Sequence, residues 1–323
     1  MASAARIDVH QHLFPPTYRT LLDERGLSAG GWPAPDWDAR SAIAMMDRRS
    51  IATGVLSLSA PGVHFGDDAE ARALARDINE LGAELVKDRP DRFGQFAALP
   101  LPDLDGALAE AAYAFDELHA DGVVLLSNAH GRYLGDKAFD PLWAELDARG
   151  AVVFIHPTAP PMQMLDGLPS PLLDFPFDTT RTALHMVANG VMSRYTRVKV
   201  ILSHAGGFLP YAALRFTGAA QFVPGTTPEG IVADLRRFYF DTALSSTPYA
   251  LPSLLAFAEP GHILYGSDFP FAAEPWGVQF DAGLDEYPDW RPGRLSAVNR
   301  GNAEALFPRL APAPAGNPVP GNR

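Results

Sequence analysis

Two histidines stand one residue apart near the amino terminus, in the stretch RIDVHQHLF. Because successive side chains of a strand point to opposite faces, His10 and His12 project to the same side of a strand. Two imidazoles held together in this way suit a metal ion, although an isolated His-x-His pair is more often two unrelated polar residues. For Asp8, on the same run, a structural hydrogen bond is expected and not metal ligation.

Three more residues of this kind end apolar, β-rich runs. His156 ends FIH, His204 follows VILS, and Asp268 follows ILYGS. In an α/β barrel the carboxyl ends of all strands meet at one mouth, so four strands would bring His or Asp to the same place. Imidazoles and one carboxylate, in a chain without cysteine, suit zinc first, manganese second, and also iron. The fourth run, GVVLLS, carries no lysine to bridge two ions, which favours a single metal.

The elements that would position these residues alternate along the chain. Amphipathic segments such as 68–88, 104–120 and 139–150 predict helices. Between such segments, eight apolar runs predict strands at 6–12, 53–59, 93–100, 122–127, 151–157, 198–206, 238–244 and 262–270. Eight strands alternating with helices predict a (β/α)8 TIM barrel. A doubly wound open sheet is the alternative, but HQHLFPP stands where its Gly-rich phosphate loop would follow the first strand.

We expect a single catalytic domain over residues 1–307. Residues 14–36 are rich in Pro and Gly and predict an inserted loop with a short helix over the barrel mouth. Residues 308–323 are rich in Pro, Ala and Gly without periodicity, which predicts a disordered tail.

Composition narrows the partners. The chain has 323 residues, 47% of them hydrophobic, and a formal net charge of -12 that repels nucleic acid and anionic membranes. It has no stretch apolar enough to span a bilayer and no recognisable signal peptide. The lack of cysteine suits a reducing compartment. We therefore expect a cytoplasmic protein whose partner is a small molecule.

These motifs together resemble the amidohydrolase superfamily, and within it the metal-dependent decarboxylases that include aminocarboxymuconate semialdehyde decarboxylase and the γ-resorcylate decarboxylases. The resemblance runs from DVHQH through FIHP, VKVILSHAGG and ILYGSDFP to GNAEALF. Within that branch the chain is most similar to the 6-methylsalicylate decarboxylases, through GWPAPDW, LSLSAPG, AVVFIHPT and YFDTALS.

The resemblance implies a set of metal ligands: His10, His12, His156 and Asp268. It also implies that Asp268 and His204 act in catalysis. A homodimer is implied as well, in which Arg215 reaches the neighbouring subunit's active site, although a surface salt bridge is an equally open role for Arg215.

Three further residues are candidates for substrate contact. Trp32, like Trp37, offers aromatic surface for an aryl substrate or simply fastens the loop. Ser59 follows the second strand. Asp241 ends the seventh strand and would line the site or orient His204.

The expected reaction is the non-oxidative decarboxylation of an ortho-hydroxybenzoate such as 6-methylsalicylate to 3-methylphenol and CO2, without an organic cofactor. Asp268, helped by His204, would protonate the ring. This role requires a raised pKa, which burial would supply and a neighbouring cation would oppose. Two alternatives stay open. The same metal site would also suit a hydrolase that activates water against a lactone or amide. A catalytically inactive binding or scaffold protein would bind no metal.

Overall fold

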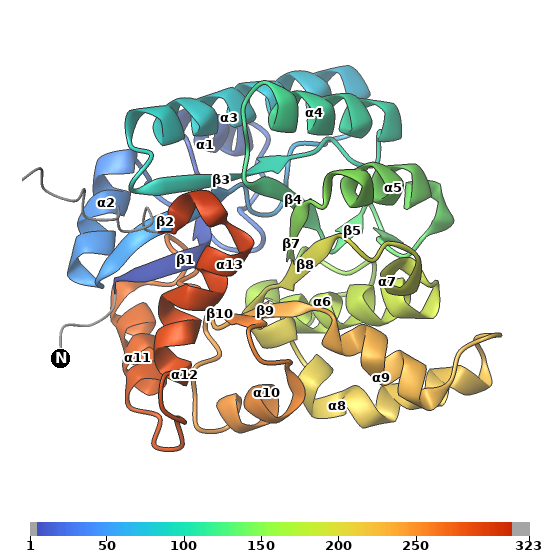
Figure 1. The fold of residues 1–323 in the computed structure, drawn as a ribbon. Helices are drawn as coiled ribbons and strands as arrows, with labels where there is room; N and C mark the ends of the chain where they lie inside the picture. Colours follow the sequence, from blue (N-terminus) through green and yellow to red (C-terminus); the bar gives the residue numbers. More distant parts are fainter. Residues whose placement is uncertain (1–4, 312–323) are drawn as a thin grey trace, which may run out of the picture.

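The computed structural model describes residues 5–311, and eight parallel strands surrounded by helices form its centre (Figure 1). The strands lie side by side in chain order: β1 (Arg6–His12), β2 (Ile51–Ser57), β3 (Phe93–Ala98), β4 (Gly122–Leu126), β7 (Val152–His156), β8 (Lys199–Leu202), β9 (Tyr239–Asp241) and β10 (Ile263–Leu264). The ring closes where Val9 N–H donates to the Tyr265 carbonyl at 3.0 Å and Asp268 N–H to the His10 carbonyl at 2.8 Å. The predicted strands and barrel are confirmed.

Helices occupy the outside of the barrel and the segments around its mouth. The α-helices are α1 (Pro16–Glu24), α2 (Ala39–Arg48), α3 (Asp68–Asp88), α4 (Leu104–Asp116), α5 (Asp140–Arg149), α6 (Ser170–Ala188), α7 (Val191–Arg194), α8 (Leu209–Phe216), α9 (Pro228–Arg236), α10 (Leu251–Phe257), α11 (Glu274–Asp285), α12 (Arg294–Ser296) and α13 (Asn302–Leu306). The short elements are the hairpin β5 (Asn128–Ala129) and β6 (Arg132–Tyr133), the 3-10 turns η1 (Lys137–Phe139), η2 (His204–Gly206), η3 (Thr217–Gln221) and η5 (Pro308–Leu310), and the π-turn η4 (Ala297–Gly301).

Every residue of β1 is buried, although the strand includes charged and polar side chains. Ile7 and Val9 lie in the apolar core. At the start of the strand, Arg6 donates to Asp285 at 2.6 Å on the floor of the barrel, the end opposite the mouth. The strand thus carries anchoring groups at its first residue and the paired histidines at its last three residues.

The segment 14–36 contains helix α1 and a loop that reaches the mouth. Tyr18 and Leu22 of α1 are buried, and the Tyr18 hydroxyl donates to the Gly62 carbonyl at 2.6 Å. Because Gly62 follows β2, this bond holds α1 against the carboxyl end of the barrel.

At the other end of the chain, order continues past the predicted boundary at residue 307. Pro308–Leu310 form the turn η5, Leu310 is buried, and Arg309 donates to Asp121 at 2.5 Å beside the start of β4. The remainder of the expected tail, 312–323, lies outside the described residues.

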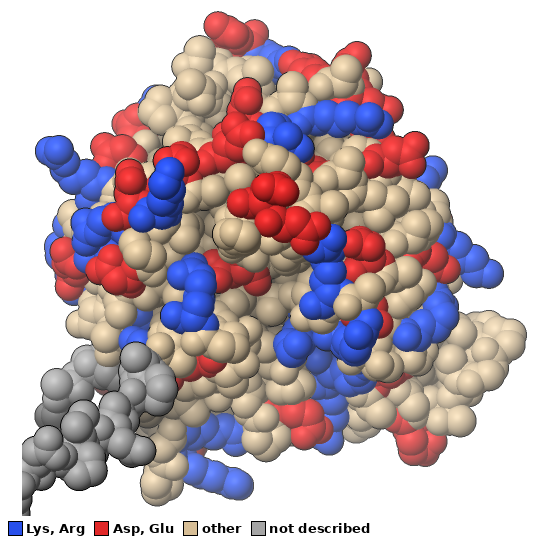
Figure 2. All heavy atoms as spheres, turned by 45° about the horizontal axis from the view of Figure 1, so that its top comes forward, with Lys and Arg blue, Asp and Glu red and all other residues tan. Residues whose placement is uncertain are grey.

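Charged side chains of both signs are interspersed on the face shown in Figure 2. The net charge of -12 is therefore not gathered into one acidic field there. Among the described helices, none combines the length and the apolar character that crossing a bilayer requires.

Candidate active site and metal centre

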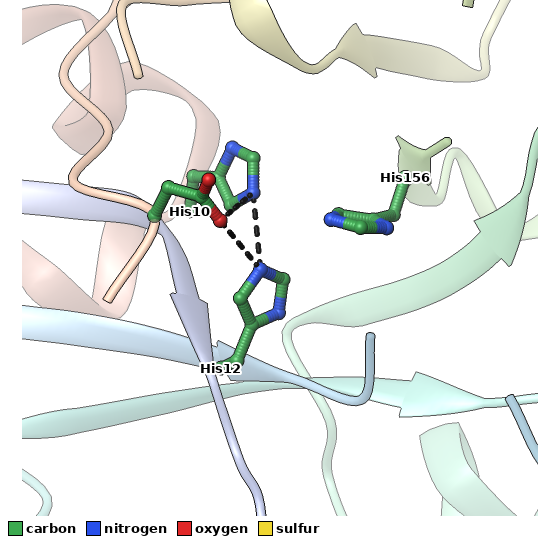
Figure 3. Close-up of side chains that lie close together, drawn as sticks. His10, His12 and His156 are labelled. Carbon is green, nitrogen blue, oxygen red and sulfur yellow. Dashed lines mark hydrogen bonds and ion pairs between the residues drawn. The ribbon is translucent and has the colours of Figure 1, made fainter. Parts of the chain in front are cut away.

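Four buried side chains converge at the mouth, three from β1 and β7 and one from the segment after β10. The Nε2 atoms of His10 and His12 lie 3.1 Å apart, and Asp268 Oδ1 lies 3.2 Å from the first and 3.1 Å from the second. The ring of His156 faces them, 4.8 Å from that of His12 between ring centres (Figure 3). One donor atom from each of the four lies within 4.8 Å of the others. The strand-end residues singled out by the sequence do meet.

The far nitrogen of His10 is held by a carboxylate. His10 Nδ1 lies 2.7 Å from Asp241 Oδ2, and both side chains are fully buried. A carboxylate oxygen accepts hydrogen bonds, so Nδ1 donates to Asp241 and Nε2 is the nitrogen that faces the centre of the group.

Backbone carbonyls hold the other two rings in the same way. His12 Nδ1 lies 3.2 Å from the Ser57 carbonyl oxygen, and His156 Nδ1 lies 2.8 Å from the Pro157 carbonyl oxygen. A carbonyl cannot donate, so both rings carry their proton on Nδ1 and present Nε2 as a donor of electrons. Three such nitrogens and one carboxylate oxygen, all buried and facing one point, fit a divalent cation.

The electrostatics of the group differ among its three histidines. Burial lowers the pKa of His12 and lowers that of His156 well below its usual range, so both rings are neutral. Burial would also lower the pKa of His10, but the charges of Asp241 and Asp268 outweigh it and raise that pKa to about 10. A metal ion would therefore bind His10 by displacing the proton on Nε2.

The pKa of Asp268 differs from the expectation. Burial alone would raise it, but the charge of His10 and the hydrogen bonds from the rings of His10 and His204 hold it well below its usual range. The prediction of a raised Asp268 pKa is therefore wrong, because three imidazoles surround this carboxylate and outweigh its loss of solvent.

His204 stands beside the four-residue group without belonging to it. Its Nε2 lies 3.4 Å from Asp268 Oδ2, and the residue lines the cavity at the mouth. The backbone is left-handed here, with φ of +52°, and its N–H donates to Asp241 Oδ1 at 2.9 Å. Within the described chain, His204 Nδ1 has no hydrogen-bond partner. This ring therefore contacts Asp268 through Nε2 while its other nitrogen is uncommitted.

Asp241 thus supports two histidines and does not line the cavity. Two roles were predicted for Asp241: to line the site or to orient His204. Its contacts fit the orienting role. It holds the ring of His10 and the backbone of His204 at the same time.

A cavity of about 450 Å³ opens above the group, with His156, His204 and Asp268 at its base. Its walls are mostly apolar and aromatic, including Trp32, Phe175, Phe208, Leu244, Leu254 and Phe271. Ser59 also lines it, whereas Trp37 is packed in the core. Among the described residues that line the cavity, none is a lysine or an arginine.

Arg215 lies on α8 with an exposed side chain and does not line the cavity of its own chain. The ion pairs formed within residues 5–311 do not include it, so the surface salt bridge considered for it is not formed there.

Sequence reasoning missed most of the cavity walls. Phe175 and Phe208 come from α6 and from the residue before α8, and no strand-end motif marks either position. Phe271 had a usable signal, because it follows Asp268 by three residues in SDFPF.

Asp8 has the structural role predicted for it. Its carboxylate accepts from the N–H groups of His10 and Ser267, both at 3.0 Å, and from Gln11 Nε2 at 3.1 Å. Burial raises its pKa to about 6. The bonds link the end of β1 to the segment that carries Asp268.

The remaining histidines lie outside the group of His10, His12, His156 and Asp268, which we call the metal group. They are His64, His119, His130, His185 and His262, as expected.

Comparison with known proteins places this site in a family. A family model described as amidohydrolase matches residues 7–309. The chain is 42% identical over 316 residues to a 6-methylsalicylic acid decarboxylase of Penicillium expansum, covering 95% of this chain and 97% of that protein.

Solved structures agree with this assignment. A crystal structure of an amidohydrolase II superposes with a TM-score of 0.89 at 34% identity, covering 94% of this chain and 99% of the other. A dihydroxybenzoic acid decarboxylase from Polaromonas sp., with bound manganese and the inhibitor 2-nitroresorcinol, has a TM-score of 0.80 at 25% identity and covers 95% and 97% of the two chains. The chain belongs to the amidohydrolase family.

Proposed function

We propose that this protein is a metal-dependent, non-oxidative decarboxylase of an ortho-hydroxybenzoate. 6-Methylsalicylate is the first candidate substrate, with 3-methylphenol and CO2 as products. The observation that carries the proposal is the group of three histidines and one aspartate at the base of an apolar cavity. The 42% identity to a 6-methylsalicylic acid decarboxylase supports the choice of substrate.

The cavity suits a small aromatic acid with apolar substituents. Its aromatic side chains, among them Trp32, Phe175 and Phe271, offer ring surface, and its volume of about 450 Å³ is within the range of small-ligand sites. Ser59 is proposed to contact the polar edge of the ring. A divalent ion held by the four ligands would supply the positive charge that fixes the carboxylate and the phenolic oxygen of the substrate.

We propose a single ion, with zinc as the first choice and manganese as the second. All four donor atoms are nitrogen or oxygen, which both ions accept. Manganese gains support from the similar dihydroxybenzoic acid decarboxylase, which holds that ion.

Asp268 is proposed to deliver the proton that replaces the carboxylate. The proton adds to the ring carbon that bears this group, the carbon–carbon bond breaks, and its electron pair restores the aromatic ring as CO2 leaves. Because the pKa of Asp268 is low, its carboxyl group is a strong acid once protonated. His204 Nε2, 3.4 Å from Asp268 Oδ2, passes the proton to it and regains one from solvent in the open cavity.

A homodimer is proposed to complete the site. Tyr211 and Leu214 of α8 are 86% and 80% exposed, and Tyr211 lines the cavity. Exposed apolar side chains at one surface mark a site of association. Arg215 adjoins them, so a second copy of the chain seated on this surface would bring Arg215 to the partner's cavity, whose described lining includes no lysine or arginine.

The test is product analysis. The metal-free protein is reconstituted separately with zinc and with manganese, and incubated without oxygen with 6-methylsalicylate, while 3-methylphenol and CO2 are measured. We expect equal amounts of both products. Asp268→Asn should reduce the rate at least about 100-fold, because the proton donor is lost. Asp116→Asn, a change in an exposed ion pair with Arg149, should leave it unaltered.

Metal-loaded protein that forms neither product from any hydroxybenzoate would contradict the proposal. Incorporation of ¹⁸O from labelled water into the product of a lactone or amide would establish the hydrolase alternative instead.

A further inference from the structure

Asp178, on α6, is a buried carboxylate outside both the metal group and the cavity lining. Its side chain is fully buried. It accepts hydrogen bonds from neutral donors: the Ser127 hydroxyl, Asn128 Nδ2 at 2.8 Å and the Tyr133 hydroxyl at 2.5 Å. Burying a carboxylate costs free energy, and such hydrogen bonds offset that cost without adding stability. The role of Asp178 is therefore to be found in the groups that its hydrogen bonds hold in place.

The hydrogen bonds lead from Asp178 to the ring of His156. The Ser127 oxygen that donates to Asp178 also accepts from the Thr158 N–H at 3.0 Å. This N–H belongs to the same peptide unit as the Pro157 carbonyl, which accepts from His156 Nδ1 at 2.8 Å. The peptide is therefore held at both ends, by Ser127 on one side and by His156 on the other.

Ser127 holds the strand end at a second point as well. Its own N–H donates to the carbonyl of His156 at 2.8 Å. One buried serine therefore fixes the backbone before and after Pro157, and with it the acceptor that sets the orientation of the His156 ring.

The chain of hydrogen bonds has a direction. The negative charge of Asp178 polarises the Ser127 hydroxyl, which makes its oxygen a stronger acceptor for the peptide N–H, and the carbonyl of that peptide a stronger acceptor for His156. His10 receives the same support from Asp241 in direct contact at 2.7 Å. His156 has only a carbonyl next to it, and the carboxylate lies further along the same chain of bonds.

We propose that Asp178, acting through Ser127 and the Pro157–Thr158 peptide, is a positioning residue that aims His156 at the metal and strengthens metal binding. The inference rests on the proposed role of His156 as a metal ligand.

The test compares variants that cut this chain of bonds with one that does not. Ser127→Ala removes the hydroxyl that joins Asp178 to the peptide, and Asp178→Asn removes the charge. Tyr133→Phe is the matched control, because it removes the hydroxyl that donates to the other oxygen of Asp178 and leaves the path to His156 intact. Zinc affinity is measured by competition with a chromophoric chelator, and the ligand geometry by the visible absorption bands of the cobalt-loaded protein.

We expect Ser127→Ala and Asp178→Asn to weaken zinc binding about tenfold and to shift the cobalt bands. Tyr133→Phe should bind zinc as the unaltered protein does. Unaltered zinc affinity and cobalt bands in Ser127→Ala would overturn the inference. An equal loss of zinc affinity in Tyr133→Phe would overturn it as well, because any disturbance of the buried carboxylate would then weaken binding, whether or not it cuts the hydrogen bonds to His156.

A His156→Ala variant separates this inference from the proposed ligand set. If it binds zinc with unchanged affinity, His156 is not a ligand and the proposed metal site fails. If it loses affinity while folded Ser127→Ala does not, only the role of Asp178 fails.

Discussion

At the scale of single residues, each histidine of the metal group presents one nitrogen because the other is occupied. Asp241 holds His10, and backbone carbonyls hold His12 and His156. Asp241 also accepts from the backbone N–H of His204. One buried carboxylate, Asp241, thereby holds both His10, a proposed metal ligand, and His204, which lies beside the proposed proton donor Asp268.

This coupling makes Asp241→Asn informative. His10 Nδ1 would face a neutral amide in place of a charged acceptor, so we expect the affinity for zinc to fall by about 10- to 100-fold. Competition with a chelator measures it. Asp234→Asn, a change in a partly buried pair with Arg237 away from the cavity, is the control and should have no effect on zinc affinity. Equal zinc affinity in the Asp241 variant would contradict the role assigned to this carboxylate.

The ionisation of Asp178 should appear in the pH dependence of stability. Burial raises its pKa above the usual aspartate value, although its hydrogen bonds oppose the shift. The folded state therefore holds this proton more tightly than the unfolded state. The resulting stabilisation is complete below about pH 3.9, the usual value, and is lost as the pH rises through the raised pKa.

Asp178→Asn cannot titrate at this position. We therefore expect the unfolding free energy of the metal-free wild type to fall, relative to that of this variant, as the pH rises from about 4. Urea unfolding at a series of pH values measures the difference. A difference that is constant with pH would show that the pKa of Asp178 is the same in the folded and unfolded states.

At the scale of elements, ion pairs on the barrel floor join the first strand to helix α11. Arg49, which follows α2, donates to both oxygens of Asp281, at 2.7 and 3.0 Å, and Arg6 of β1 donates to Asp285. The Tyr265 hydroxyl, beyond β10, also donates to Asp281 at 2.8 Å. These contacts close the ring at the floor, and the backbone bonds from β1 to the segment after β10 close it nearer the mouth.

Removing one partner of this buried group should be costly. We expect Arg49→Ala to lower the unfolding free energy by about 3–5 kcal/mol, because Asp281 stays buried without its main cation. Arg48→Ala is a matched control at the adjacent position, since Arg48 pairs with Glu274 at the surface and its loss should change little. Chemical denaturation measures both, and similar losses in the two variants would contradict the assignment.

At the scale of the whole molecule, the cavity opens beside exposed apolar side chains. Tyr249 is 90% exposed and, like Tyr211, lines the cavity. The proposed dimer would cover this surface. Its cavity would then be shaped by two chains, one of which supplies the metal ligands and the other Arg215.

Complementation tests this arrangement. Arg215→Ala and Asp268→Asn should each be inactive as homodimers. A mixture that is dissociated and reassembled should regain part of the wild-type rate, because a mixed dimer holds one site with Asp268 from one chain and Arg215 from the other. Leu214→Asp should give monomers in sedimentation analysis. Mixtures that stay inactive although mixed dimers form would contradict a role for Arg215 across the interface.

The barrel and the metal group were predictable from the sequence because the residues concerned lie in strands or at their ends. The eight strands follow from apolar runs, and a parallel barrel brings His10, His12, His156 and Asp268 together whatever the loops do. The low pKa of Asp268 was not predictable, because it depends on how three imidazole rings pack around one carboxylate.

Contacts made by helices were equally hidden. Asp178 is 51 residues from Ser127 in the chain, and nothing in the sequence around either residue marks their hydrogen bond. The placement of Phe175 and Phe208 in the cavity wall likewise depends on how α6 and α8 lean over the mouth. Such contacts follow from packing between helices, which the periodicity of a single segment does not encode.

Both ends of the described chain lie on the floor of the barrel. Arg6 begins β1, and Arg309 contacts Asp121 and the carbonyl of Phe93 at the starts of β4 and β3. The cavity opens on the opposite face, at the carboxyl ends of the strands. A resin, electrode or fusion protein attached at either end of residues 5–311 therefore leaves the entrance pointing away from the support, so the protein can be immobilised without blocking the approach of its substrate.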